Sequence, residues 1–308
     1  MTDNLAIEIK HLNKSYNGVK TIKDVSLSVN HGEVFALLGP NGAGKTTTTE
    51  IMEGYRSRDS GEVSVLGFDP AKGKQEYRAQ IGIVLQSIGV EPYLTVAETI
   101  EYYRGLYPHP RKLNEIIELV GLAEKRNSRV KKLSGGQQRR LDVAIALAGD
   151  PTVLFLDEPT EGFDPSARRN ARGIVKNLSS LGKTIFLTTH YMDEAEFLAD
   201  HVAIIKDGSI VTEGTVQTIA GRNTAQTTIS FHLPPSAPPL PGSFKVTRTK
   251  KGGQEILLIT TKDATNVLAQ LTAWAVTKHL ELLGLEVRQP SLEDMYLKVT
   301  QATEDHHE

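Results

Sequence analysis

Short apolar segments alternate with polar turns at the start of the chain and predict a group of β-strands. The predicted strands are residues 7–11, 25–29 and 33–38. Asn17-Gly18, between the first two strands, is typical of a hairpin turn. After Leu38 the pattern changes, because a glycine-rich loop leads into residues 45–54, which have the pattern of a helix. The chain therefore begins with an antiparallel β region and continues into mixed structure.

Farther along, apolar strands alternate with helices. The predicted strands are residues 81–86, 152–157 and 184–189, and the predicted helices are residues 95–104, 113–120, 134–148 and 165–181. This alternation predicts a parallel sheet with helices on both faces, and a hairpin at 201–211 follows it. We therefore expect an α/β domain over residues 1–222. It should have a mixed sheet, an antiparallel β subdomain and a helical subdomain at about 87–150.

The character of the sequence changes after residue 222. Residues 234–241 hold five of the 14 prolines and predict a stiff loop. After this loop we predict strands at 243–249 and 255–260, a helix at 264–283, a strand at 285–289 and a helix at 291–301. We expect a small C-terminal accessory α+β domain over residues 223–308. The sequence leaves two roles open for this domain, a packing extension or a tether between two copies of the chain.

Composition and charge exclude several classes of protein. The 35 basic and 37 acidic residues give a net charge of −2, so a nucleic-acid partner bound through a broad basic field is not expected. We interpret one local basic run as a solvated face, with a nucleic-acid patch as the alternative; it comprises Arg126, Arg129, Lys131, Lys132, Arg139 and Arg140. The absence of cysteine excludes disulfides, thiolate metal sites and cysteine nucleophiles. No apolar run approaches the length of a membrane span, and the N-terminus lacks the features of a signal peptide. We expect a cytoplasmic chain with no direct membrane insertion.

Residues 39–46, Gly-Pro-Asn-Gly-Ala-Gly-Lys-Thr, match the phosphate-loop pattern G-x-x-x-x-G-K-[ST] between a predicted strand and a predicted helix. Glycines let backbone N–H groups approach phosphate oxygens, and the helix N-terminus presents further donors. Lys45 is expected to contact the β- and γ-phosphates, and Thr46 to offer its hydroxyl to Mg²⁺. Thr47 adds a hydroxyl near the α-phosphate. The expected fold class is therefore an α/β P-loop NTPase.

A second predicted strand ends in two acids. The apolar run at 153–156 is followed by Asp157 and Glu158. Ligands bind beyond the carboxyl ends of parallel strands, so both carboxylates should face the phosphate loop. Asp157 is expected to hold Mg²⁺ through water, and Glu158 to act as general base toward the attacking water. Two adjacent acids are otherwise often a solvated turn, and the matched phosphate loop favours the catalytic interpretation.

His190 ends the next predicted strand, after two threonines. A histidine at such a place is either a hydrogen-bonded structural residue or a donor to the γ-phosphate that positions water. The sequence alone leaves both interpretations open.

A second glycine motif opens a helix. Ser134 is a good N-cap for the Gly135-Gly136-Gln137 segment, which makes this helix N-terminus a second place that favours an anion. One nucleotide cannot use two such loops from the same crevice. We therefore expect a symmetric dimer in which each chain places this motif on the γ-phosphate of the other.

Together these motifs carry a resemblance. GPNGAGKT at 39–46, LSGGQ at 133–137, FLDEP at 155–159 and TTH at 188–190 resemble the nucleotide-binding subunit of ATP-binding-cassette (ABC) transporters, over roughly residues 5–220. The resemblance implies an ATPase with ATP and Mg²⁺ as cofactors. It also implies a separate membrane permease and a second ATPase, either another copy of this chain or a paralogue. The expected location is cytoplasmic, on the inner face of the cell membrane through the permease.

The resemblance also implies roles for single residues. Tyr16 falls where the family stacks an aromatic ring on adenine, Gln86 where it places a Mg²⁺ contact, and Asp164 where an aspartate reaches across the dimer. Glu161 and Phe163 depart from the family's usual Thr or Ser and Leu. The expected catalytic residues are Glu158, His190 and Lys45, and the expected metal contacts are Thr46, Gln86 and Asp157. The expected nucleotide contacts are Tyr16, Gly39, Pro40, Asn41, Gly42, Ala43, Gly44, Lys45, Thr46, Thr47, Gln86, Ser134, Gly135, Gly136, Gln137 and Asp164.

Three further stretches of sequence indicate which type of ABC transporter ATPase the chain resembles. Residues 94–98, 189–196 and 291–297 look like the daunorubicin-resistance type of drug and antibiotic exporter ATPases. This resemblance favours export of a drug, an antibiotic or a lipid-like molecule. An importer ATPase is one alternative, and an ABC ATPase that acts on nucleic acid or the ribosome is another. A purely ATP-sensing regulator is disfavoured by the presence of both Glu158 and His190.

Overall fold

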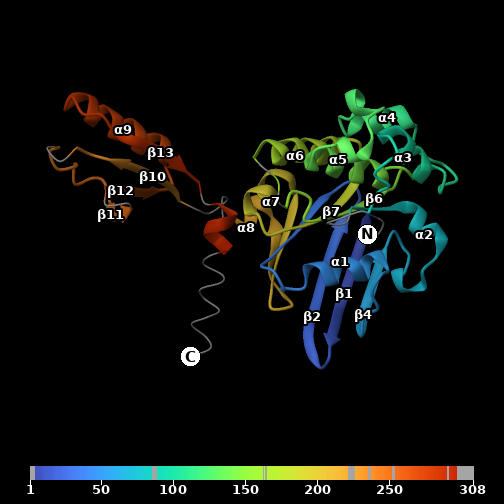
Figure 1. Cartoon of the computed structure of the whole chain (residues 1–308). Coiled ribbons are helices and arrows are strands. Elements are labelled where there is room, and N and C mark those ends of the chain that lie inside the picture. Colours follow the sequence, from blue (N-terminus) through green and yellow to red (C-terminus); the bar gives the residue numbers. More distant parts are fainter. Residues whose placement is uncertain are drawn as a thin grey trace. The chain divides into compact units, whose positions relative to one another are not determined.

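The structure is a computed structural model of the whole chain (Figure 1). It describes residues 4–84, 89–161, 163, 165–220, 226–234, 237–251, 254–289 and 291–296. The chain divides into two compact units, Met1–Val216 and Gln217–Glu308. The first unit has two sheets and the second unit has one, and each unit has its own core, so each is described by itself.

A six-stranded sheet organises the first unit. Its strands are β5 (Ile81–Val84), β6 (Val153–Asp157), β7 (Thr184–Thr189), β3 (Val34–Leu38), β8 (His201–Lys206) and β9 (Ser209–Thr215), in that order across the sheet. The first five are parallel and β9 is antiparallel to β8. Every residue of β3, β6 and β7 is buried, as expected for parallel strands covered on both faces. The predicted mixed sheet is therefore confirmed.

A three-stranded antiparallel sheet accompanies it. Its order is β2 (Val19–Asn30), β1 (Leu5–Tyr16) and β4 (Ser60–Val65). Asn17 and Gly18 join β1 to β2 with φ of 49° and 82°, which is the left-handed backbone that such a turn requires. The predicted hairpin is confirmed, and β4 is a strand that the sequence pattern did not reveal. These strands share one apolar core with β3, β6 and β7.

Helices connect the strands of the first unit. They are α1 (Lys45–Glu53), α2 (Gln75–Gln80), α3 (Val96–Arg104), α4 (Leu113–Leu119), α5 (Gly135–Ala146), α6 (Pro165–Ser180), α7 (Met192–Leu198) and α8 (Val216–Ile219), the last reaching into the second unit. Short 3₁₀ turns lie at Pro70–Lys72, Ala123–Lys125 and Val130–Lys132. α3, α4 and α5 lie within the range predicted as helical, and Figure 1 shows them gathered together.

The second unit is an antiparallel sheet with one long helix. Its strands, β10 (Thr227–His232), β11 (Val246–Lys251), β12 (Gln254–Thr261) and β13 (Leu283–Arg288), lie in the order β11-β12-β10-β13. Side chains of β10 and β12 form a core with Leu271 of α9 (Ala264–Thr277). The α+β class is as expected, with two corrections. β10 was not predicted, and α9 ends six residues before the predicted 283, because the chain turns at His279 with φ of 51°. The predicted final helix is seen at 292–296, and the rest of it lies outside the described residues.

Candidate functional site

The glycine-rich loop joins β3 to α1 and holds the amino group of Lys45. Gly44 is the N-cap of α1 with φ of 105°, a conformation that L side chains rarely adopt. Lys45 is 5% exposed, and its Nζ donates hydrogen bonds to the carbonyl oxygens of Gly39 at 2.9 Å and Pro40 at 3.2 Å. The loop therefore curls around a buried ammonium group at the N-terminus of a helix. This geometry suits a polyphosphate anion.

The acidic strand end lies beside this loop because β6 and β3 both flank β7. Asp157 ends β6, and its carboxylate accepts hydrogen bonds from the hydroxyls of Thr46, at 3.3 Å, and Thr188. Glu158 follows with φ of 45°, and its backbone N–H donates to the hydroxyl of Thr188 at 3.1 Å. Residues that are far apart in sequence thus meet at the carboxyl edge of the sheet, as predicted.

Glu158 stands between Lys45 and His190. Its Oε1 is 3.2 Å from Nζ of Lys45, and its Oε2 is 3.2 Å from Nδ1 of His190. Burial acts to raise the pKa of Glu158, but the hydrogen bonds and charges of Lys45 and His190 together outweigh it. The pKa therefore lies below its ordinary value, and the carboxylate is held ionised. The three predicted catalytic residues form one cluster.

The arrangement of oxygens around Thr46 fits Mg²⁺. The Thr46 hydroxyl and the Asp157 carboxylate are hard ligands, and they lie within hydrogen-bond distance of each other. Among the described residues, no group of three or more His, Asp or Glu side chains could hold a metal ion by itself. Such a sparse set matches the way Mg²⁺ is usually bound, by one or two carboxylates together with substrate phosphates and water.

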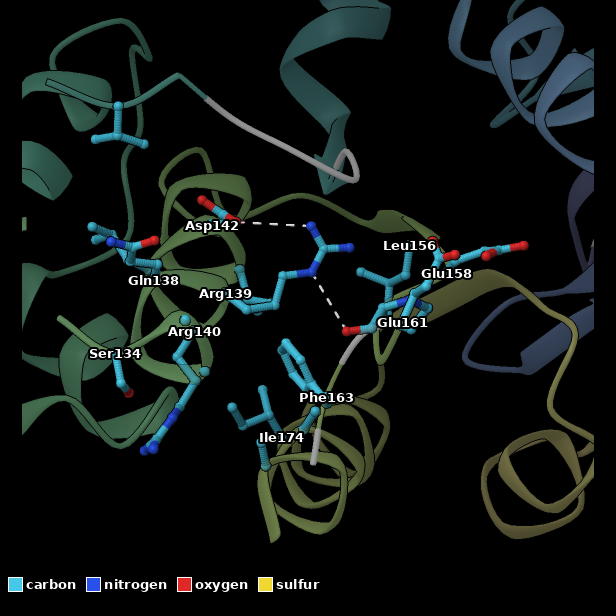
Figure 2. A pocket seen from close by; sticks show the side chains of 18 of the residues that line it. Ser134, Gln138, Arg139, Arg140, Asp142, Leu156, Glu158, Glu161, Phe163 and Ile174 are labelled. Atoms are coloured by element: carbon cyan, nitrogen blue, oxygen red, sulfur yellow. Dashed lines mark hydrogen bonds and ion pairs between the residues drawn. The ribbon is translucent and has the colours of Figure 1, made fainter. Parts of the chain in front are cut away.

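The second glycine motif begins α5 with a full capping box. The Ser134 hydroxyl accepts from the N–H of Gln137 at 3.4 Å, and the Gln137 side chain accepts from the N–H of Ser134 at 3.0 Å. Ser134 and Gly135 are exposed. Ser134, Gly136 and Glu158 all line one cavity of about 750 Å³ between α5 and α6 (Figure 2).

Arg139 is a functional candidate that sequence reasoning placed wrongly. It was expected on a solvated face, but it is 8% exposed. Figure 2 shows its side chain reaching from α5 toward Asp142 and the turn after β6. Its guanidinium donates to the carbonyl oxygens of Asp157 at 3.1 Å and Pro159 at 3.4 Å, and it lies 3.8 Å from the Asp142 carboxylate. Arg139 therefore holds the acidic turn. The sequence pattern that could have revealed this burial is helical spacing. Arg139, Asp142, Val143 and Ala146 are three or four residues apart, which places them on the same buried face of α5.

The remaining predicted residues fall into three groups. Tyr16 ends β1, and its ring lies 5.4 Å from Nζ of Lys14 and 5.5 Å from the guanidinium of Arg56. In the loop, Gly39 and Ala43 are buried, Pro40, Asn41 and Gly42 are exposed, and Thr47 is half-buried. Gln86 and Asp164 lie outside the described residues.

A phosphate loop beside an acidic strand end, on this sheet, defines a P-loop NTPase. Residues 22–161 match the family described as ABC transporter, and residues 227–291 match the family described as ABC transporter domain-containing protein-like, C-terminal domain. The chain is 33% identical to the linearmycin resistance ATP-binding protein of Bacillus subtilis, over 96% of this chain and 99% of the relative. It is 36% identical to the Nod factor export ATP-binding protein I of Rhizobium johnstonii, over 96% and 95%. The chain therefore belongs to the ATP-binding proteins of ABC transporters.

Solved structures support the same family assignment. An ATP-binding subunit of an ABC transporter matches with a TM-score of 0.63 and 27% identity, over 71% of this chain and 93% of that one. A dimeric ATP-binding cassette in a post-hydrolysis state, bound to ADP and Pi, matches with a TM-score of 0.60 and 27% identity, over 68% and 98%. The chain is thus an ATP-binding and ATP-hydrolysing subunit of an ABC transporter, as the sequence motifs predicted. No helix in the described parts of the chain has the length and apolar composition to cross a membrane.

Proposed function

We propose that Lys45, Glu158 and His190 are the catalytic group of this ATPase. The observation that carries the proposal is the position of the Glu158 carboxylate, 3.2 Å from each of its two partners. When ATP binds, the phosphates take the place of the Glu158 carboxylate at Lys45, and Glu158 turns to accept a proton from the attacking water. His190 then donates to the γ-phosphate and fixes the water. The residues position charge and protons, which is most of what phosphoryl transfer requires of a protein.

Mg²⁺ is part of this proposal. Thr46 and Asp157 are the residues that would hold it, with Gln86 as a third contact. Bound there, the ion supplies charge neutralisation for the phosphates. Thr188 keeps the Asp157 carboxylate oriented through its hydroxyl.

The active form is a dimer with another ATPase chain, a second copy or a paralogue. Ser134 and the exposed N-terminus of α5 provide donors for an anion, and they complete the site of the opposite chain together with Asp164. The solved cassette bound to ADP and Pi is a dimer, and it matches 68% of this chain. Its dimeric state supports this proposal.

The second unit has an edge suited to joining two copies. Among the described strands, β13 pairs only with β10. Leu285 and Val287 on β13 are 39% and 45% exposed, and Val287 lies opposite the buried Ile229. An exposed apolar edge strand readily pairs with another chain. We propose that β13 tethers two copies, so that the ATPase units open without separating.

The transported molecule is an exported drug, antibiotic or lipid-like compound, carried by a separate permease that brings the chain to the cytoplasmic face of the membrane. The names of the two relatives, a resistance protein and an export protein, support this direction. We propose that the helical region after β5 contacts the permease. It exposes the rings of Tyr93 and Tyr102, which are 63% and 65% exposed.

Photo-crosslinking in native membranes tests this proposal. A crosslinker placed at Tyr93 or Tyr102 should capture one polytopic membrane protein, and the same protein should co-purify with the unmodified chain. A crosslinker at exposed Thr249 in the second unit is the matched control and should capture far less of it. Capture only from residues 243–289, with none from 89–103, would overturn the proposed permease contact.

A further inference from the structure

Helix α6 carries three cations along one side, and all three contact the segment that contains His190 and α7. Arg168, Arg172 and Lys176 are spaced four residues apart, so they project from the same face of the helix. Arg172 pairs with Asp193 at 2.5 Å, and both Arg172 and Lys176 lie over the ring of Phe197, at 5.7 and 4.9 Å. The Phe197 side chain is exposed. The contacts of Arg172 and Lys176 therefore attach α7 to α6 at the surface.

Arg168 makes a different contact. Its guanidinium carbon lies 4.2 Å from the centre of the Tyr191 ring, which is cation–π geometry. Arg168 Nε is buried and has no hydrogen-bond partner among the described residues. The tyrosine ring is therefore a main partner of this buried part of the cation.

Tyr191 in turn lies against the catalytic histidine. The centres of the Tyr191 ring and the His190 imidazole are 4.0 Å apart, with the planes inclined by 40°. The backbone of Tyr191 is fixed as well, because its N–H donates to the Thr189 hydroxyl at 3.0 Å and it is the N-cap of α7. On its other side, His190 reaches the Glu158 carboxylate at 3.2 Å. Arg168, Tyr191, His190 and Glu158 thus form a continuous series of contacts.

We propose that Tyr191 and Arg168 are positioning residues for His190. The Tyr191 ring keeps the imidazole in the orientation that meets Glu158 and the γ-phosphate, and Arg168 holds the ring. This inference rests on the roles proposed above for His190 and Glu158.

The test compares variants at this contact with a matched variant farther along the same helix. Tyr191→Leu and Arg168→Gln remove the ring and the cation, and kcat for ATP hydrolysis should fall about tenfold while KM for ATP changes less than about twofold. Tyr191→Phe keeps the ring and should retain kcat within about threefold of wild type. Lys176→Gln removes a cation that contacts only Phe197 in this series and should leave kcat and KM unchanged. Thermal melting establishes that each variant is folded.

If Tyr191 acts through His190, the effects of substituting the two residues should not add. In a His190→Ala background, Tyr191→Leu should cause no additional fall in kcat, because the group that it positions is already gone. An equal fall in both backgrounds would show that Tyr191 acts elsewhere and would overturn the inference. A wild-type kcat for Tyr191→Leu would also overturn it when His190→Ala lowers kcat. If His190→Ala itself hydrolyses ATP like wild type, the proposed function of His190 fails, which is a separate result.

Discussion

At the scale of single residues, the carboxyl group of Glu53 at the end of α1 is unusual because it is buried in the core of the first unit. It is 6% exposed. Burial, together with the negative charges of Asp157 and Glu50, raises the pKa of Glu53 to about 8. The folded protein therefore holds a proton on Glu53 that the unfolded chain releases from about pH 4.5 upward.

This difference predicts a pH-dependent stability. Unfolding releases the proton, so the free energy of unfolding contributed by Glu53 is complete below pH 4.5 and is lost as the pH rises to about 8. Glu53→Gln should match wild type near pH 5 and exceed it at pH 8.5, by on the order of 2–4 kcal/mol. The measurement is chemical denaturation without nucleotide or divalent ions. Exposed Glu118→Gln is the control, and a Glu53→Gln protein whose stability follows wild type at both pH values would contradict the argument.

Local motifs made much of the site predictable at this scale. The loop that holds Lys45 is one uninterrupted stretch of sequence, and so is the pair Asp157-Glu158. A predicted strand directly before each stretch is enough to place it at the edge of the sheet. Arg139 and Tyr191 are different, because their roles depend on contacts with residues that lie elsewhere in the fold. Arg139 donates to a carbonyl oxygen 20 residues away, so its spacing in α5 indicates the buried face but not the group that it binds.

At the scale of elements, the N-terminus of α5 is the clearest case of a structure built for a partner. Its first N–H groups are capped by Ser134 and Gln137, yet Ser134 and Gly135 remain exposed. A helix end of this kind favours an anion, and we propose that this anion is bound to a second chain.

Mixing two inactive variants tests whether that anion belongs to the other chain. Ser134→Arg fills the helix end and should abolish hydrolysis, as should Lys45→Ala. A mixed dimer then has one site with both defects and one site with neither. An equal mixture of the two proteins should recover up to about a quarter of wild-type activity, since half of the dimers are mixed. If the mixture stays inactive while exchange of subunits is demonstrated, or if Ser134→Arg is active alone, completion of the site by a second chain is wrong.

Element boundaries show where the sequence pattern was insufficient. The apolar stripe of α9 continues past Thr277 through Leu280 and Leu282, so periodicity alone extends the helix to 283. The chain instead turns at His279, because residues 283–288 pair with β10 in the sheet. β10 was missed for the same reason. Its threonines and serine look like a polar loop, and only pairing on both sides makes it a strand.

At the scale of the whole molecule, the two units have separate cores, and only the first contains the motifs of the ATPase. The proposed tether predicts how hydrolysis depends on the concentration of the protein. Linking two copies raises their effective concentration, so hydrolysis per chain should change little on dilution.

A lysine on the exposed edge of β13 tests this tether. Val287→Lys places a charge where an apolar strand edge would meet its copy, and hydrolysis per chain should fall steeply on dilution. Thr249→Lys is the control on β11, the opposite edge of the same sheet, and should follow wild type. Identical dilution profiles for wild type and Val287→Lys would favour the packing-extension role for the second unit.

The central claim is that Glu158, held ionised beside Lys45, is the general base of an ATPase site. The most direct measurement is hydrolysis of ATP by Glu158→Gln, with ATP binding and dimer formation followed in the same samples. We expect hydrolysis to fall at least about a hundredfold, because the amide keeps the shape of the side chain but cannot accept the proton. ATP should still bind, and it should hold a long-lived dimer. Hydrolysis by Glu158→Gln at the wild-type rate would contradict the account.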